Sequence, residues 1–206
     1  MERYFSELAT AFVRGRLDNP AASIEDGIAN GLRLHKFKQG SELPRVRKVL
    51  STLRALAPQN LLDVGSGRGT FLWPLLATLP DVQVTAIDVS EQRASDIDAV
   101  RKGGIGRLRG FQMDVCDIAF PDASFDGVTI LEVLEHLRDP ETAFRQAIRV
   151  ARRFVIASVP STQDDNPEHI HLFTVNRLRE MAVEAGCEQP KIEHVLNHRI
   201  LICIKP

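Results

Sequence analysis

The sequence predicts an α/β fold in which helices cover both faces of a mostly parallel sheet. From residue 60 onward, short apolar runs alternate with stretches of helical periodicity, which is the pattern that strand–helix–strand units produce. The apolar runs 127–131 and 153–158 are nearly continuous, as expected for strands that are covered on both sides. Helical crossovers join such strands in parallel and with a right-handed connection, so a single sheet is expected.

The order of the elements follows from periodicity and from boundary residues. Strands are expected at 61–64, 82–88, 107–114, from 125 onward, and at 153–160, 191–196 and 199–204. Helices are expected within 1–17 and at 44–57, 69–79, 90–102, 139–150 and 174–186. Ser90 and Thr174 are typical helix caps, and Pro44 suits a first helical turn. Pro74 either bends its helix or marks its first turns.

The composition limits the classes of function. The chain has 206 residues, of which 44% are hydrophobic, and Lys plus Arg number 26 against 27 for Asp plus Glu. The net charge of −1 provides no global attraction to nucleic acid or to acidic membranes. Three cysteines are too few and too scattered for a disulfide framework or a CxxC metal site. The charged N-terminus lacks the apolar core of a signal peptide, so we expect a soluble, cytoplasmic protein with no membrane partner.

A glycine-rich turn follows the first expected strand. Gly65, Gly67 and Gly69 alternate with other residues between that strand and the next helix, so backbone N–H groups are available to a ligand. The dinucleotide-binding fingerprint requires a further glycine where this chain has Thr70. Asp63, two residues before the first glycine, would repel a pyrophosphate but attract an amino-bearing ligand. An NAD-dependent oxidoreductase is therefore disfavoured.

Acidic residues end three successive strands. Asp63 ends the first strand, Asp88 the second and Asp114 the third. In open α/β sheets, ligands bind in the crevice outside the carboxyl ends of the strands. A carboxylate at the position of Asp88 can accept hydrogen bonds from both hydroxyls of a ribose. Asp114 can accept a hydrogen bond from an adenine amino group. The three acids together predict an adenosine-containing ligand.

These motifs resemble those of the class I S-adenosylmethionine-dependent methyltransferases. The similar segments are LLDVGSGRG at 61–69, VTAIDVS at 84–90, FDGVTILEVLEHL at 125–137 and HIHLFTVNRLREMAVEAG at 169–186. The resemblance covers about residues 45–206. It implies a Rossmann-like, seven-stranded, mostly parallel sheet whose last strand is antiparallel, with S-adenosyl-L-methionine as the cofactor. We expect an N-terminal helical extension over residues 1–43 and a methyltransferase domain over 44–206.

The resemblance also implies the cofactor site. The glycine turn and Asp63 would line the methionine end, Asp88 would hold the ribose, and Asp114 would hold the adenine. The full set of expected cofactor-binding residues is Asp63, Gly65, Ser66, Gly67, Gly69, Asp88, Val89, Met113, Asp114 and Leu131.

The methyl acceptor is expected to be a small molecule, as in the ubiquinone-biosynthesis O-methyltransferases that the 125–137 segment resembles. Methyl transfer from a sulfonium is an in-line displacement that depends mainly on positioning. A base is needed only for a nucleophile that carries a high-pKa proton. The candidate catalytic residues are Glu132 and His136, just past the fourth expected strand, and His169 after the fifth.

Two alternatives stay open. In one, Glu132, Glu135, His136 and His169 bind a divalent metal, a set that resembles the methyltransferases of the 3′-terminal ribose 2′-hydroxyl of small RNAs. Hard cations bind such carboxylates and can activate vicinal hydroxyls. The neutral overall charge argues against an RNA partner, whereas the basic residues between 33 and 54 argue weakly for it. In the other alternative, the chain binds S-adenosylmethionine without catalysis.

The N-terminal residues 1–43 are the natural cover for the acceptor site, because only short loops are expected after residue 60. A cover would exclude water and favour the charge-neutralising transfer. We therefore predict that residues 1–30 close over the acceptor.

Overall fold

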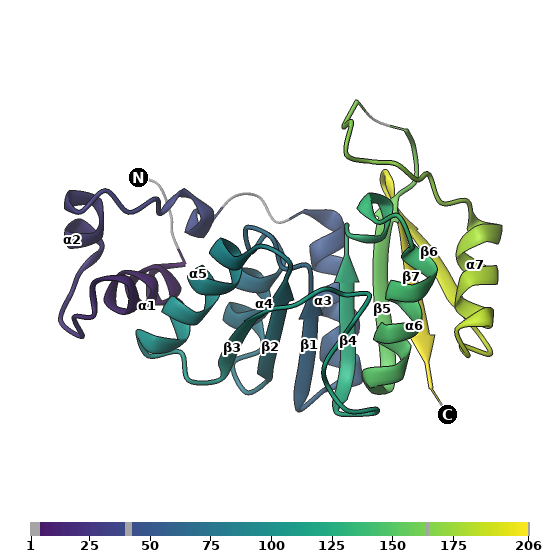
Figure 1. Ribbon diagram of the computed structural model, residues 1–206, viewed down its shortest axis with the longest axis horizontal. Coiled ribbons are helices and arrows are strands. Elements are labelled where there is room, and N and C mark those ends of the chain that lie inside the picture. The colour runs from purple at the N-terminus through teal and green to yellow at the C-terminus, as the bar shows by residue number, and fades with distance from the viewer. Residues whose placement is uncertain (1–4, 40–42, 164, 206) are drawn as a thin grey trace.

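The computed structural model describes residues 5–39, 43–163 and 165–205 and contains one seven-stranded sheet (Figure 1). The strand order is β3-β2-β1-β4-β5-β7-β6. The first five strands pair in parallel, and β7 pairs antiparallel with both β5 and β6. The strands are β1 (Asn60–Val64), β2 (Gln83–Asp88), β3 (Leu108–Gln112), β4 (Phe125–Leu131), β5 (Ala151–Pro160), β6 (Lys191–Val195) and β7 (His198–Ile204). The expected α/β fold, with its antiparallel last strand, is confirmed.

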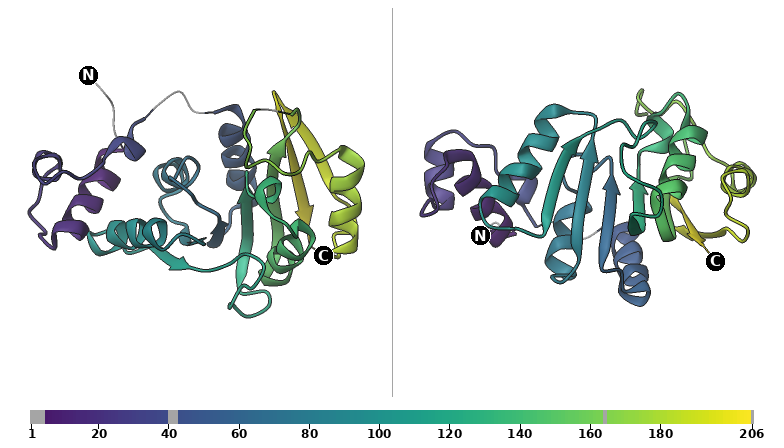
Figure 2. Two further views of the ribbon diagram at one scale, coloured as in Figure 1. Left: turned by 45° about the horizontal axis from the view of Figure 1, so that its top comes forward. Right: turned by 60° about the horizontal axis from the view of Figure 1, so that its bottom comes forward.

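Helices cover both faces of the sheet, and each face has its own hydrophobic core (Figures 1 and 2). The helices are α1 (Ser6–Leu17), α2 (Ile24–Ala29), η1 (His35–Phe37), α3 (Pro44–Leu56), α4 (Leu72–Thr78), α5 (Glu91–Lys102), η2 (Leu134–His136), α6 (Pro140–Val150) and α7 (Val175–Glu184). One core contains buried residues of α1, α3, α4 and α5, and the other contains residues of α6 and α7. Among the described helices, none is long and apolar enough to cross a lipid bilayer.

The helices of the domain begin where the capping residues predict. The side chains of Ser90 and Thr174 accept backbone N–H bonds at the starts of α5 and α7, which satisfies free N–H groups of the first turn. Pro44 opens α3, and Pro74 lies in the first turn of α4 rather than bending it. The third strand ends at Gln112, two residues earlier than expected, because the chain turns where the Asp114 carboxylate accepts the Cys116 N–H.

Helix α1 packs against α5 beyond the β3 edge of the sheet, and α2 packs against α1 (Figures 1 and 2). Two glycines allow this close approach: a Cβ on Gly15 would lie 1.9 Å from the Ala99 carbonyl oxygen, and a Cβ on Gly103 would lie 1.7 Å from the Ala11 carbonyl oxygen. Helix α2, which the sequence did not predict, begins with a capping box that Ser23 forms. Of the predicted extension, residues 1–4 and 40–42 lie outside the described residues.

Candidate cofactor and acceptor site

Two adjoining cavities lie at the carboxyl ends of the central strands. The larger has a volume of about 740 Å³ and the smaller about 170 Å³, and both are lined by Gly65, Gly67 and Glu132. Of the expected cofactor residues, the larger also contains Asp88, Val89, Met113 and Asp114, and the smaller contains Asp63, Ser66 and Leu131. The cavities therefore bring together all of the expected cofactor residues except Gly69.

Asp63 forms the floor of the smaller cavity and is 2% exposed. Its carboxylate accepts hydrogen bonds from the hydroxyls of Ser66 (2.6 Å) and Thr129 (2.8 Å). Burial raises the pKa of Asp63 to about 6; the two hydroxyl hydrogen bonds oppose this rise, and the nearby Asp88 charge adds to it. A buried acid held this way gains stability as an anion when a cationic group binds beside it.

The glycines of the turn after β1 have backbone conformations that favour glycine, with φ of 67° at Gly65 and 57° at Gly67. A Cβ on Gly65 would lie 2.4 Å from a methyl group of Val133, so the backbone there is packed against the chain itself. A Cβ on Gly67 would meet only the Gly65 oxygen, at 3.7 Å, and would otherwise occupy the cavities that Gly67 lines. The backbone at Gly67 is thus open to a ligand.

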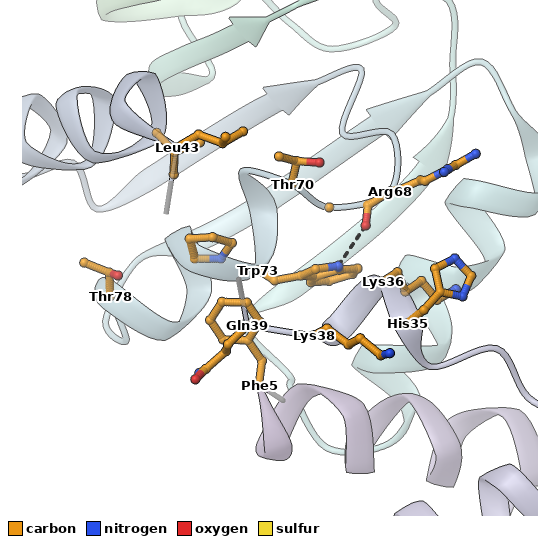
Figure 3. Close-up of a pocket in the computed structure, with 13 residues that line it drawn as sticks. Phe5, His35, Lys36, Lys38, Gln39, Leu43, Arg68, Thr70, Trp73 and Thr78 are labelled. Atoms are coloured by element: carbon orange, nitrogen blue, oxygen red, sulfur yellow. Dashed lines mark hydrogen bonds between the residues drawn. The ribbon is translucent and has the colours of Figure 1, made fainter. Parts of the chain in front are cut away.

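Gly69 has a different role from its neighbours. Its missing Cβ leaves room for the indole of Trp73, which would lie 2.0 Å away. The Trp73 indole N–H donates to the Arg68 carbonyl (Figure 3). Gly69 lines a third cavity of about 490 Å³, together with Trp73 and residues of the N-terminal segment such as Lys36. Gly69 therefore packs against Trp73 and lines the third cavity, and it does not line the two cavities described above.

The second and third acids line the larger cavity. Asp88 is 2% exposed, and its carboxylate accepts the backbone N–H groups of Gly67 and Ser90, each at 2.9 Å. Asp114 is exposed and accepts the Cys116 N–H. Because a carboxylate has about four acceptor positions, both acids keep capacity for ligand hydroxyl or amino groups. Val89, beside Asp88, is 70% exposed and presents an apolar surface to this cavity.

Glu132 follows β4 and has a left-handed backbone, with φ of 55°. Its carboxylate accepts a hydrogen bond from the Ser158 hydroxyl (2.7 Å), and His198 Nε2 lies 3.0 Å from its second oxygen. Arg45, at the start of α3, lies 3.8 Å from the same oxygen. Sequence reasoning missed Arg45 and His198, because α3 and β7 reach Glu132 only through the tertiary fold.

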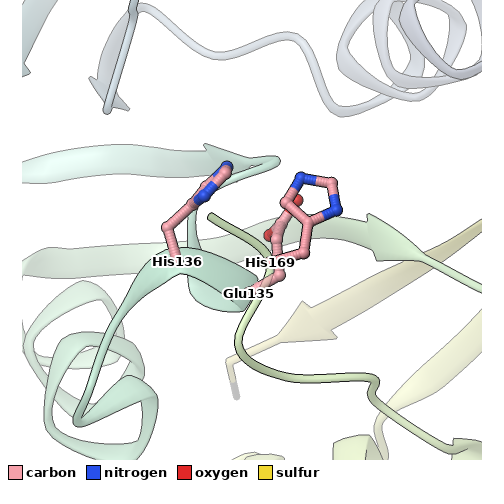
Figure 4. A group of neighbouring side chains, drawn as sticks. All are labelled: Glu135, His136 and His169. Carbon is pink, nitrogen blue, oxygen red and sulfur yellow. The ribbon is translucent and has the colours of Figure 1, made fainter. Parts of the chain in front are cut away.

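Glu135, His136 and His169 form a second group of side chains (Figure 4). Their potential metal-ligand atoms lie within 4.8 Å of one another, and the two imidazole rings are 4.7 Å apart. His136 lines the larger cofactor cavity and lies 3.0 Å from the Glu168 carbonyl oxygen, whereas His169 lines a separate cavity. Glu132, the fourth residue of the predicted metal set, instead pairs with Ser158 and His198.

Comparison with known proteins identifies the family. Residues 62–155 match the family described as methyltransferase domain. The chain is 30% identical to an O-methyltransferase from Pyrenophora dematioidea over 186 residues, which cover 79% of this chain and 67% of that protein. It is 37% identical to the O-methyltransferase cnsE from Penicillium expansum over 120 residues, which cover 56% of this chain and 43% of that protein.

A solved O-methyltransferase family protein from Burkholderia thailandensis has the same fold, with a TM-score of 0.65 over 79% of this chain and 55% of that one, at 18% identity. The chain spans about half or less of the length of the first curated relatives that it matches. The match at 30% identity across two thirds of a relative nevertheless establishes the family. With the strand order and the glycine turn described above, the chain belongs to the class I S-adenosylmethionine-dependent methyltransferases.

Proposed function

We propose that this chain transfers a methyl group from S-adenosylmethionine to an oxygen atom of a small molecule. The observation that carries the proposal is the pair of joined cavities, with buried Asp63 in one and buried Asp88 in the other, and with the open backbone of Gly67 between them. This arrangement fits a ligand that has an ammonium group at one end and a ribose at the other. When bound, that cofactor supplies a methyl group on a positively charged sulfur.

Different acidic residues bind different parts of the cofactor. Asp63 offers a negative charge to the amino group of the methionine end, beside Ser66 and Leu131. Asp88 offers carboxylate oxygens to the ribose hydroxyls, and Asp114 offers them to the adenine amino group. Exposed Val89 and half-buried Met113 line the same cavity and offer apolar surface to the faces of the adenine ring. In this proposal Gly69 supports the turn and does not touch the cofactor.

Transfer to oxygen is supported by the relatives reported above, which carry the name O-methyltransferase. The displacement requires the acceptor oxygen to be held in line with the methyl carbon and the sulfur. Glu132 lines both cavities and is therefore a candidate to face the acceptor. His136, which lines the larger cavity, and His169, which lines a separate cavity, are kept as candidate catalytic residues because the centroids of their rings lie 4.7 Å apart.

An RNA acceptor is less well supported. Several of the basic residues between 33 and 54 already face carboxylates: Lys36 pairs with Asp96, and Lys48 pairs with Glu193. Paired cations release fewer counterions on binding phosphate and so contribute less to RNA affinity. The second candidate function is a metal-assisted methyl transfer, because Glu135, His136 and His169 could together hold a metal ion.

The N-terminal extension is proposed as the cover of the methionine and acceptor side. Its part nearest to the glycine turn, His35 to Gln39, lines the cavity behind Gly69 (Figure 3). Helix α1 packs against α5 and α2 packs against α1, so both lie farther from the acceptor side.

The test has two steps. Calorimetric titration with S-adenosylhomocysteine should give one binding site per chain. Incubation with methyl-deuterated S-adenosylmethionine and a set of small hydroxyl compounds, read by mass spectrometry, should give deuterated methyl ethers. Binding without product from any acceptor would support the non-catalytic alternative, and no binding would end the proposal.

A further inference from the structure

Glu132 and His198 form a carboxylate–imidazole pair that the cofactor site does not account for. They meet because β5 lies between β4 and β7 in the sheet (Figure 1), which brings the end of β4 close to the start of β7. Ser158 of β5 holds Glu132 in place by two hydrogen bonds. Its carbonyl accepts the Glu132 N–H at 2.9 Å, and its hydroxyl donates to Glu132 Oε1 at 2.7 Å. These two bonds hold Glu132 in its left-handed backbone, a strain that is typical of functional positions.

The two residues of the pair line different cavities. Glu132 lines both cofactor cavities, and His198 lines a further cavity of about 140 Å³. Arg45 lines this cavity and the smaller cofactor cavity as well. A molecule in the 140 Å³ cavity would therefore contact His198 and Arg45, which lie 3.0 Å and 3.8 Å from the Glu132 carboxylate that faces the cofactor cavities.

The 140 Å³ cavity is mostly apolar. Its walls include Leu43, Pro44, Val195 and Leu196. Leu196, at the tip of the β6–β7 hairpin, is 77% exposed, and Leu43 is 37% exposed. Exposed apolar side chains gathered around a small cavity favour an apolar ligand, because the ligand removes their surface from water.

One ring nitrogen of His198 is paired with Glu132, and the other can accept a proton from a ligand. Nε2 faces Glu132 at 3.0 Å, so in the neutral ring the proton on Nε2 is donated to the carboxylate and Nδ1 carries the lone pair. Within the described part of the chain, Nδ1 makes no hydrogen bond. Among the described residues, the Glu132 carboxylate pairs with the ring, and Arg45 lines the same cavity and lies 3.8 Å from that carboxylate.

We infer that His198 is a general base for methyl transfer, with Glu132 as its positioning residue, and that the acceptor is an apolar or aromatic hydroxyl compound bound over Leu43 and Leu196. This inference rests on the proposed function. The acceptor oxygen forms its bond to the methyl carbon as the carbon–sulfur bond breaks, and that bonding pair stays on sulfur. The hydroxyl proton passes to His198 Nδ1, and the resulting imidazolium is balanced by the Glu132 carboxylate.

The first experiment needs no acceptor. Diethylpyrocarbonate reacts with the free lone pair of a neutral imidazole, and peptide mass mapping assigns each modified histidine. At neutral pH we expect His198 to be modified, with exposed His194 of the same hairpin as the internal reference. Modification of His194 with none at His198 would show that no lone pair is accessible and would overturn the inference.

The second experiment tests catalysis with phenol, catechol, 2-naphthol and 1-octanol as acceptors and with methyl-deuterated S-adenosylmethionine. His198→Ala should lower kcat about 100- to 10,000-fold, should leave S-adenosylhomocysteine affinity within about twofold, and should regain activity when imidazole is added. His194→Ala is the matched control and should match the unmodified protein. Rescue by imidazole is not expected of a residue that acts only through the fold.

Two outcomes contradict the inference while leaving the proposed function intact. One is unchanged kcat in His198→Ala. The other is the formation of methyl ethers from polar hydroxyl compounds but from none of the four apolar or aromatic acceptors. If the unmodified protein did not bind S-adenosylhomocysteine, the proposed function itself would be contradicted.

Discussion

The Ser66 hydroxyl donates a 2.6 Å hydrogen bond to the Asp63 carboxylate, so the turn after β1 folds back over the acid that β1 presents. This contact, with the one from Thr129, gives a buried carboxylate two hydroxyl partners and no cationic one among the described residues. In the proposed function, the positive charge comes from the ligand.

The first prediction concerns Asp63→Asn. Because burial raises the pKa of Asp63 from 3.8 to about 6, the folded protein binds more protons than the unfolded chain between these pH values. The free energy of unfolding therefore falls as pH rises through this window, by at most about 3 kcal/mol. At pH 7.5, Asp63→Asn should thus raise the melting temperature while weakening S-adenosylhomocysteine binding at least about tenfold.

Asp117→Asn is the control for the loss of one acidic charge, since Asp117 is exposed and lies outside both cofactor cavities. Asp117→Asn should change neither the melting temperature nor the affinity for S-adenosylhomocysteine. Unchanged cofactor affinity in Asp63→Asn would contradict the assigned role of this carboxylate.

The second prediction separates backbone strain from loss of ligand space. Gly67→Ala and Gly31→Ala both place a Cβ at positive φ, 57° and 74°, which costs about 1–2 kcal/mol of stability in each case. Only the Gly67 methyl group would enter the cofactor cavities. Calorimetry should show S-adenosylhomocysteine affinity reduced at least about tenfold in Gly67→Ala and unchanged in Gly31→Ala. Equal affinities in the two variants would remove Gly67 from the binding site.

The third prediction concerns the docking of α1 on α5. In Gly15→Ala the new Cβ would lie 1.9 Å from the Ala99 carbonyl oxygen, so the helices must separate. We expect a stability loss of about 1–3 kcal/mol, which is typical of overpacking, and faster amide hydrogen exchange in α1. Gly106→Ala, which adds a Cβ to open space, is the control. Identical exchange in the two variants would contradict this docking.

The fourth prediction distinguishes the metal-assisted alternative. The proposed mechanism uses no metal, so methyl transfer by protein treated with EDTA should equal that of untreated protein. Activity that is lost with EDTA and restored by Mg²⁺ or Mn²⁺ would instead assign a catalytic ion to Glu135, His136 and His169.

The sequence was sufficient for most of the fold because local signals agreed with the tertiary structure. Ser90, Thr174 and Pro44 mark helix starts, and the apolar runs mark buried strands. The convergence of Asp63 and Asp88 on adjoining cavities also followed from the sequence, since parallel strands end at one edge of the sheet.

The surroundings of Glu132 could not be predicted in the same way. His198 reaches Glu132 only because β7 inserts antiparallel beside β5, across a separation of 66 residues that has no local signature. The role of Gly69 was also hidden, because its contact with Trp73 depends on how the helix after the turn folds back. Short helix α2 was missed because its few apolar residues give no clear periodicity.

The most direct test of the account is calorimetric titration of the unmodified chain with S-adenosylhomocysteine and, separately, with NAD. We predict saturable binding of S-adenosylhomocysteine at one site per chain, together with a higher melting temperature, and no heat from NAD. Binding of NAD, or the absence of both heat and thermal stabilisation with S-adenosylhomocysteine, would contradict the proposed adenosyl-sulfonium site.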